Sequence, residues 1–191
     1  MIKKALYLTL SLTLTACISS PSIEDEHRPD HWGYRIDDQS NFYKISDTVY
    51  RSEQPSKELI PLIHKYNIDA VINLRARNDD KVVLKDEKLN LIHIPINTWS
   101  IDREDLLKVM KEIQLAKQAN KNILIHCYHG SDRTGASIAM YRIIFEQWST
   151  QDALNEMKYG GYGFHPIWIN IEKLFNPENI KWIQQQLLNP S

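Results

Sequence analysis

Apolar and polar residues fall into blocks along the chain, and the period of the pattern changes from block to block. Between residues 41 and 55, aromatic and β-branched residues alternate with polar ones, which is the pattern of half-buried strands. Further on, short apolar runs have the length of fully buried strands. The expected strands lie at about 42–45, 48–52, 69–75, 91–96 and 122–126.

Between these runs, apolar residues recur every three or four positions, as they do on one face of a helix. The clearest case is 102–119, where Leu106, Val109 and Ile113 share a face. The expected helices lie at 55–66, 79–90, 102–119, 134–148, 150–159 and 166–188. The last of them should break at Asn176-Pro177, because proline lacks the N–H that a continuous helix needs.

Strands that alternate with helices in this way predict an α/β fold with a central, mostly parallel sheet flanked by helices. We expect residues 41–191 to form a single domain, preceded by a polar tether and extended segment at 17–40. In open sheets of this kind, ligands bind beyond the carboxyl ends of the strands. The loop 127–133 directly follows the expected strand 122–126, so the functional site should lie there.

The first residues have the anatomy of an export signal. Two lysines near the start precede a mostly apolar run over 5–16, which is too short to span a bilayer. The run ends in LTAC (14–17), which resembles the lipobox of bacterial lipoproteins. The resemblance implies a lipoprotein signal peptide at 1–16 and a lipid on Cys17, and an ordinary cleaved signal is the alternative. Ile18 in place of an aspartate favours the outer membrane, so we expect an exported, periplasm-facing lipoprotein.

Composition and charge narrow the range of partners. The chain has 191 residues and a formal net charge of −1. Without 1–16, which hold two of the 23 basic residues and none of the 24 acidic ones, the net charge is −3. No long basic run or basic-aromatic stripe is present, so a nucleic-acid partner is not expected. Membrane contact should therefore come from acyl chains on Cys17 and not from attraction to anionic lipid.

The second cysteine lies where a strand pattern gives way to a helix pattern. If Cys17 is lipidated, Cys127 has no disulfide partner in the chain, so it is either inert or present for its reactivity. A tight loop before a helix turns backbone N–H groups inward, and the helix dipole adds partial positive charge. Gly130 relieves crowding in such a loop, and the Arg133 fork matches two oxygens of a phosphate. The expected phosphate-binding residues are Cys127, Tyr128, His129, Gly130, Ser131, Asp132 and Arg133.

The same field favours the thiolate form of the cysteine, which is the nucleophilic form. The segment HCYHGSDRTG (126–135) resembles the H-C-x5-R-[ST]-G signature of the cysteine-dependent protein tyrosine and dual-specificity phosphatase superfamily. The segments at 28–33 (RPDHWG), 41–55 and 139–163 look like the exported bacterial branch of the dual-specificity phosphatases. The resemblance therefore covers nearly all of the chain after the signal.

This resemblance implies a role for each residue of the signature. Cys127 would form a phosphocysteine intermediate, and Arg133 would hold the phosphate in the ground and transition states. The hydroxyl of Thr134 would assist the thiolate, and His126 would orient the loop through hydrogen bonds. Enzymes of this class require neither a metal nor a cofactor, and none is expected here.

The resemblance also implies a general acid, which protonates the departing oxygen. In the family an aspartate from the loop after the preceding strand supplies this proton. Here Asp102 is the first carboxylate after the expected strand 91–96. The alternative is that Asp102 only caps the helix that follows, with Asp105 as a partial capping-box partner.

The composition of the loop bears on the substrate. It has one acidic residue, Asp132, and no lysine, whereas relatives that attack inositol phosphates or phosphoinositides tend to carry lysines there. We therefore expect a phosphorylated protein as substrate, with phosphotyrosine ahead of phosphoserine and phosphothreonine. His129 would weaken this preference in an acidic compartment, where it gains a proton. The alternatives are a pseudophosphatase that binds phosphate without turnover, a phosphoinositide or inositol phosphate phosphatase, and a sulfurtransferase.

Overall fold

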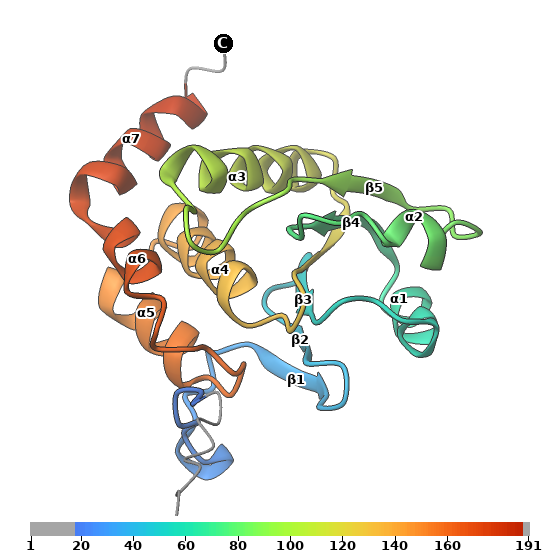
Figure 1. Cartoon of the computed structure of the whole chain (residues 1–191), viewed down its shortest axis with the longest axis horizontal. Helices are drawn as coiled ribbons and strands as arrows, with labels where there is room; N and C mark the ends of the chain where they lie inside the picture. The colour runs from blue at the N-terminus through green and yellow to red at the C-terminus, as the bar shows by residue number, and fades with distance from the viewer. Residues whose placement is uncertain (1–17, 189–191) are drawn as a thin grey trace, which may run out of the picture.

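The computed structural model describes residues 18–188, and a six-stranded sheet runs through its centre (Figure 1). The strands are β1 (Tyr34–Asp37), β2 (Phe42–Lys44), β3 (Val49–Ser52), β4 (Ile68–Asn73), β5 (Asn90–His93) and β6 (Asn122–His126). They follow the order β1-β2-β3-β6-β4-β5. The pairings among β3, β6, β4 and β5 are parallel, and β1 and β2 extend the sheet with antiparallel pairings. The predicted α/β fold with a mostly parallel sheet is confirmed.

Helices cover both faces of this sheet. They are α1 (Ile60–Lys65), α2 (Asp80–Val83), α3 (Arg103–Gln118), α4 (Asp132–Phe145), α5 (Thr150–Tyr159), α6 (Ile169–Glu172) and α7 (Pro177–Leu188), with 3-10 turns η1 (Asp25–His27), η2 (Lys57–Leu59) and η3 (Lys173–Phe175). Figure 1 shows α1 and α2 on one side and α3 and α4 on the other. The helices α5, α6 and α7 pack against α4, and α7 also packs against α3. The predicted break at Asn176 is confirmed, and the Asn176 side chain accepts a hydrogen bond from the Asn179 N–H at 2.9 Å.

The side chains of β6 alternate between two hydrophobic cores. Ile123 and Ile125 pack into the larger core with α3 and α4, whereas Leu124 packs into the smaller core with α1. All three are fully buried, which is why this central strand reads as an uninterrupted apolar run. The carboxyl end of β6 is thus held on both faces and both edges, and it forms a rigid base for the loop that follows.

The predicted helix at 79–90 is wrong in length, because only the short helix α2 forms there. Val82 is exposed, whereas Leu84 is fully buried in the smaller core and ends the helix. The residues KDEK (85–88) offer no apolar side chain that could extend a buried helical face, so the chain turns towards β5 instead.

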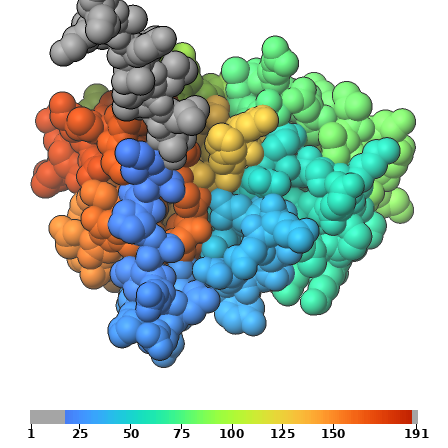
Figure 2. All heavy atoms as spheres, turned by 60° about the horizontal axis from the view of Figure 1, so that its bottom comes forward, coloured from blue at the N-terminus to red at the C-terminus, as the bar shows by residue number. Residues whose placement is uncertain are grey.

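The N-terminal segment packs on the domain, and the sheet already begins at Tyr34, so the predicted domain start at residue 41 falls inside the fold. The N–H of Ser20 donates to the Phe164 carbonyl at 2.7 Å, and the N–H of Ile23 donates to the Tyr159 carbonyl at 2.9 Å. Figure 2 shows the segment as a blue band beside the orange and red residues of the C-terminal half. These contacts join the segment to the turn after α5.

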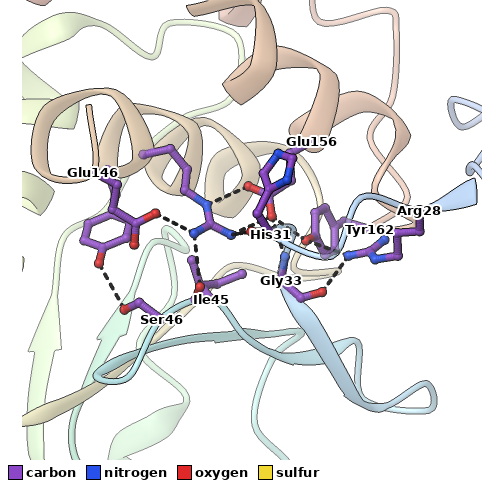
Figure 3. Close-up of polar contacts among 10 residues, drawn as sticks. Arg28, His31, Gly33, Ile45, Ser46, Glu146, Glu156 and Tyr162 are labelled. Carbon is purple, nitrogen blue, oxygen red and sulfur yellow. Dashed lines mark hydrogen bonds and ion pairs between the residues drawn. The ribbon is translucent and has the colours of Figure 1, made fainter. Parts of the chain in front are cut away.

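A buried polar cluster fastens this segment (Figure 3). Glu156 is 1% exposed and accepts hydrogen bonds from the Gly33 N–H at 2.6 Å and the Tyr162 hydroxyl at 3.0 Å. It also forms two bonds of 2.8 Å with the Arg142 guanidinium. Burial alone would lower the pKa of Arg142, but the hydrogen bonds and charge of Glu156 outweigh burial and raise it, so the guanidinium stays charged. Arg28 completes the cluster with bonds to the Gly33 carbonyl and the Tyr162 hydroxyl.

Within residues 18–188, no helix combines the length and the apolar character needed to cross a membrane. The predicted signal peptide at 1–16 and the predicted lipidation site Cys17 lie outside the described residues. Both stay predictions.

Candidate active site

The loop between β6 and α4 lies in the middle of the carboxyl edge of the sheet (Figure 1). β6 ends at His126, which is in register with Ser52 at the end of β3 and with Asn73 at the end of β4. Three parallel strands therefore end side by side below the loop. The sequence predicted a site at this position in the fold.

The backbone carbonyls of residues 126–130 all accept hydrogen bonds from the surrounding scaffold. The donors are Leu74 N for His126 O (2.9 Å), His126 Nδ1 for Cys127 O (3.0 Å), Gln54 N for Tyr128 O (3.0 Å), Asn41 Nδ2 for His129 O (2.8 Å) and Arg51 Nη2 for Gly130 O. In a trans peptide, the N–H of the next residue points away from the carbonyl. The N–H groups of residues 127–131 therefore turn away from these donors, as a backbone site for an anion requires.

Gly130 is the residue at which this loop meets β3. Its φ is +72°, in the left-handed region that favours glycine. A Cβ at this position would lie 2.4 Å from the Ser52 carbonyl oxygen and 2.8 Å from the Glu53 nitrogen, both of them backbone atoms. The predicted need for glycine is confirmed, and its cause is the backbone of the adjacent strand.

The loop begins with the candidate nucleophile. Cys127 is a free thiol, 3% exposed, and it precedes the N-terminus of α4. Arg133 lies in the first turn of α4, where its Nη1 donates to the carbonyls of Leu74 (3.3 Å) and Ile96 (3.2 Å). Within residues 18–188, neither the buried Nε of Arg133 nor the buried hydroxyl of Thr134 has a hydrogen-bond partner. Both groups are thus available to a ligand or to the thiolate.

His126 is fully buried and bridges the loop to α2. Its Nε2 lies 2.8 Å from Oδ2 of Asp80, and its Nδ1 lies 3.0 Å from the Cys127 carbonyl. Both neighbours are acceptors, so both ring nitrogens donate only in the protonated imidazolium form. Through these two contacts His126 ties the first peptide of the loop to α2.

Asp80 was not among the predicted site residues. Its other carboxylate oxygen accepts a hydrogen bond from the Gln54 side chain at 2.9 Å, and Gln54 in turn accepts one from Arg75. The sequence placed Asp80 in a helix beside Asp79, and no local signal distinguished these two aspartates. Only the tertiary fold shows which of them reaches His126.

The remaining loop residues face outwards or brace the loop. Tyr128 is 54% exposed, and its ring lies under the Arg75 guanidinium. Asp132 accepts hydrogen bonds from the backbone N–H of His165 (2.9 Å) and from its Nδ1 (3.0 Å), which joins the start of α4 to the segment after α5. The His129 and His165 rings lie 6.1 Å apart, and Ser131 is buried. The structure therefore places the side chain of Asp132 in a bracing contact.

Asp102 is the N-cap of α3, and its side chain accepts a hydrogen bond from the Asp105 N–H at 2.9 Å. The capping interpretation is thus confirmed, whereas the general-acid role stays a prediction. The loop that carries Asp102 follows Ile96, whose carbonyl accepts the hydrogen bond from Arg133. Asn170 fastens the same loop through a bond of 2.7 Å to the Thr98 carbonyl.

Comparison with known proteins gives consistent results. The family model of the dual specificity phosphatase catalytic domain matches residues 49–173. The dual specificity protein phosphatase TpbA of Pseudomonas aeruginosa is 32% identical over 136 residues, which cover 71% of this chain. The chain spans 62% of the length of this curated relative.

Solved structures agree with the sequence comparisons. The crystal structure of TpbA from P. aeruginosa superposes with a TM-score of 0.77 at 28% identity, covering 84% of this chain and 98% of that one. A Cys-to-Ser variant of TpbA in complex with pTyr gives a TM-score of 0.77 at 27% identity, covering 85% and 99%. The matched region contains the whole loop and its scaffold from β3 onwards, and on this evidence the chain belongs to the dual specificity phosphatase family.

Proposed function

We propose that the chain is a protein phosphatase that hydrolyses phosphotyrosine, with phosphoserine and phosphothreonine as further substrates. The observation that carries the proposal is the loop after β6. Its five carbonyls accept hydrogen bonds from the scaffold, so its N–H groups face away from the scaffold, beside a buried free cysteine. Such a loop binds a phosphate dianion through backbone donors, with further help from the dipole of α4.

The proposed reaction has two steps. In the first, Sγ of Cys127 forms a bond to phosphorus while the bond from phosphorus to the substrate oxygen breaks, and that oxygen takes a proton from the general acid. In the second, a water oxygen attacks phosphorus and gives a proton to the carboxylate that the general acid has become, the S–P bond breaks, and inorganic phosphate leaves with the thiolate and the acid both restored. Arg133 would hold two phosphate oxygens throughout, and the Thr134 hydroxyl would donate a hydrogen bond to the departing thiolate.

Asp102 is the proposed general acid, and His126 is proposed to orient the loop. One oxygen of Asp102 is engaged with the Asp105 N–H, which leaves the other oxygen free to carry and release a proton. Its exposed position at the start of α3 suits a group that exchanges protons with water. His126 supports the loop from below, as its bond to the Cys127 carbonyl requires.

A phosphoprotein fits this loop better than a polyphosphorylated small molecule does. The loop carries no lysine, and its one acid, Asp132, is directed to His165. The loop therefore supplies one cation, Arg133, which suits a single phosphate group. The complex of the related TpbA variant with pTyr supports the same choice.

The test compares the 18–191 form with its Cys127→Ser variant. We expect the unchanged form to hydrolyse an aryl phosphate and a phosphotyrosyl peptide with inhibition by vanadate, and we expect the variant to bind the peptide without turnover. Peptide binding without hydrolysis by the unchanged form would instead identify a pseudophosphatase. Turnover of thiosulfate alone would identify a sulfurtransferase, and a strong preference for inositol phosphates would contradict the substrate class.

We also propose that the chain is exported and held in the membrane by acyl chains on Cys17. The apolar run at 5–16 and the LTAC sequence at 14–17 support this proposal. The test is fractionation of cells that express the full chain or its Cys17→Ala variant. We expect the variant to leave the membrane fraction or to accumulate as unprocessed precursor, and unchanged fractionation would refute the anchor.

A further inference from the structure

Arg51 is a buried cation directly below the loop. It lies in β3 opposite Ile125, one position before the pairing of Ser52 with His126. Its side chain is fully buried, with the guanidinium 3.7 Å from the centre of the Tyr162 ring. One of its nitrogens, Nη2, donates to the Gly130 carbonyl.

The rest of the Arg51 guanidinium has no polar partner in the described part of the chain. Within residues 18–188, its buried Nε and Nη1 lack hydrogen-bond partners, and no carboxylate forms an ion pair with it. The buried carboxylate of Glu156 is bound instead by Arg142, the Gly33 N–H and the Tyr162 hydroxyl (Figure 3). The fold therefore buries a positive charge without pairing it.

A buried charge is costly unless an opposite charge compensates it. Burial lowers the pKa of Arg51, and the charges of Tyr162, Glu156, Cys127 and, last, Tyr43 act in the opposite direction. The Tyr43 hydroxyl is engaged elsewhere, as a donor to the Gly161 carbonyl at 3.4 Å. Tyr162 does not supply that charge near neutral pH, because burial raises the pKa of its hydroxyl further. Glu156 is already balanced by Arg142. The anion left for Arg51 is the thiolate of Cys127.

From this arrangement we infer that Arg51 is a positioning residue of the active site, which stabilises the Cys127 thiolate and holds the Gly130 peptide in its anion-binding orientation. The inference rests on the proposed function, because it concerns the nucleophile of that reaction. It assigns the thiolate a source of positive charge on the scaffold side, in addition to Arg133 and the N-terminus of α4. Arg51 acts from the scaffold side and does not touch the substrate.

The bond to Gly130 gives the second half of this role. The carbonyl of Gly130 points to Arg51, so the N–H of Ser131 on the same peptide points the opposite way. Without the guanidinium, this peptide would lose the donor that fixes its orientation. A single side chain thus couples the charge of the nucleophile to the direction of a loop amide.

The test measures the thiolate directly, independently of phosphatase turnover. The full chain and its Arg51→Met and Arg51→Lys variants are alkylated with iodoacetamide across a pH series. Modification is quantified by mass spectrometry on the tryptic peptide 122–133, which contains Cys127 and excludes Cys17. Arg142→Lys is the matched control, because it disturbs a buried arginine of the same region but keeps the positive charge that balances Glu156.

We expect the alkylation midpoint of Arg51→Met to rise by about one pH unit or more, the usual effect of losing a nearby opposite charge. Alkylation below the midpoint should then slow about tenfold for each unit of the rise. Arg51→Lys should restore most of the reactivity, since it keeps the charge. Arg142→Lys should keep the midpoint, while its thermal unfolding temperature falls because lysine cannot form both bonds to Glu156. An unchanged midpoint in a folded Arg51→Met chain would overturn the inference.

A double-mutant cycle keeps the inference testable if Arg51→Met loses stability. The thermal unfolding temperature is measured for Arg51→Met at neutral pH, with and without Cys127→Ser. If the thiolate compensates Arg51, the methionine should be tolerated better in the Cys127→Ser background, where no thiolate exists. Equal effects in both backgrounds would overturn the inference. A chain without phosphatase activity but with Arg51-dependent alkylation would refute the proposed function alone.

Discussion

Replacing Gly130 by alanine tests whether the backbone of β3 sets the position of the phosphate loop. The added Cβ would lie 2.4 Å from the Ser52 carbonyl oxygen, whereas ordinary van der Waals contact begins at 3.4 Å. The loop must therefore move away from β3 by about 1 Å. A displacement of this size in an active site costs about 100-fold in rate. The left-handed φ of +72° adds about 1–2 kcal/mol of destabilisation for any residue with a Cβ.

Gly161→Ala is the matched control, because it separates the conformational cost from the steric one. Gly161 has φ of +79°, but a Cβ there would find its nearest neighbour, Nη2 of Arg35, at 3.5 Å. Both variants should lose about 1–2 kcal/mol of unfolding free energy from the left-handed backbone alone, measured by urea denaturation. Only Gly130→Ala should also lose about 100-fold in kcat/KM with an aryl phosphate. If the two variants keep kcat/KM values within threefold of each other, β3 does not set the loop position.

Three further substitutions test the supports of the site. Asp80→Asn removes the carboxylate behind His126, and we expect the free energy of unfolding in urea to fall by about 1–3 kcal/mol and kcat to fall as well. An unchanged kcat would show that the His126–Asp80 pair is only structural. Glu156→Gln should destabilise the chain by about 3–5 kcal/mol, because it leaves Arg142 buried and unpaired. Limited trypsin digestion should then cut the N-terminal segment faster than in the unchanged chain. Equal digestion rates would contradict the role of Glu156 in anchoring this segment. Asp102→Asn should lower kcat by about 10²–10⁴ at unchanged stability if Asp102 is the acid, and a near-normal rate would leave it as a cap alone.

The fold class and the place of the site could be predicted because both depend on local patterns. β6 is buried on both faces, so it reads as an apolar run, and the polar loop after it contrasts sharply with this run. The long helix α3 shows its buried positions at regular spacing, with Asp102 as its cap. The prediction of a helix at 79–90 was wrong because few residues of this segment are buried, and so few positions do not show from sequence where a short helix ends.

The supports of the site could not be predicted, because each depends on a partner far away in the chain. Arg51 occupies a polar position of an alternating strand pattern, which normally faces solvent, yet the structure buries it completely. Arg51 packs against Tyr162, and the Gly33 N–H is bound by Glu156. In both cases the partner lies more than a hundred residues further along the chain. No local period carries information on such pairings.

The two buried arginines of this region differ in a way that separates structure from function. Arg142 has its charge balanced by Glu156 and Glu146, so it contributes a fixed anchor for the N-terminal segment. Arg51 is fully buried, yet two of its nitrogens have no partner within the described residues. A fold that can satisfy one buried arginine completely could satisfy a second with one more carboxylate. In the role that we infer for Arg51, leaving it unpaired keeps its positive charge available to the Cys127 thiolate, because a carboxylate beside the guanidinium would cancel the field that favours the thiolate.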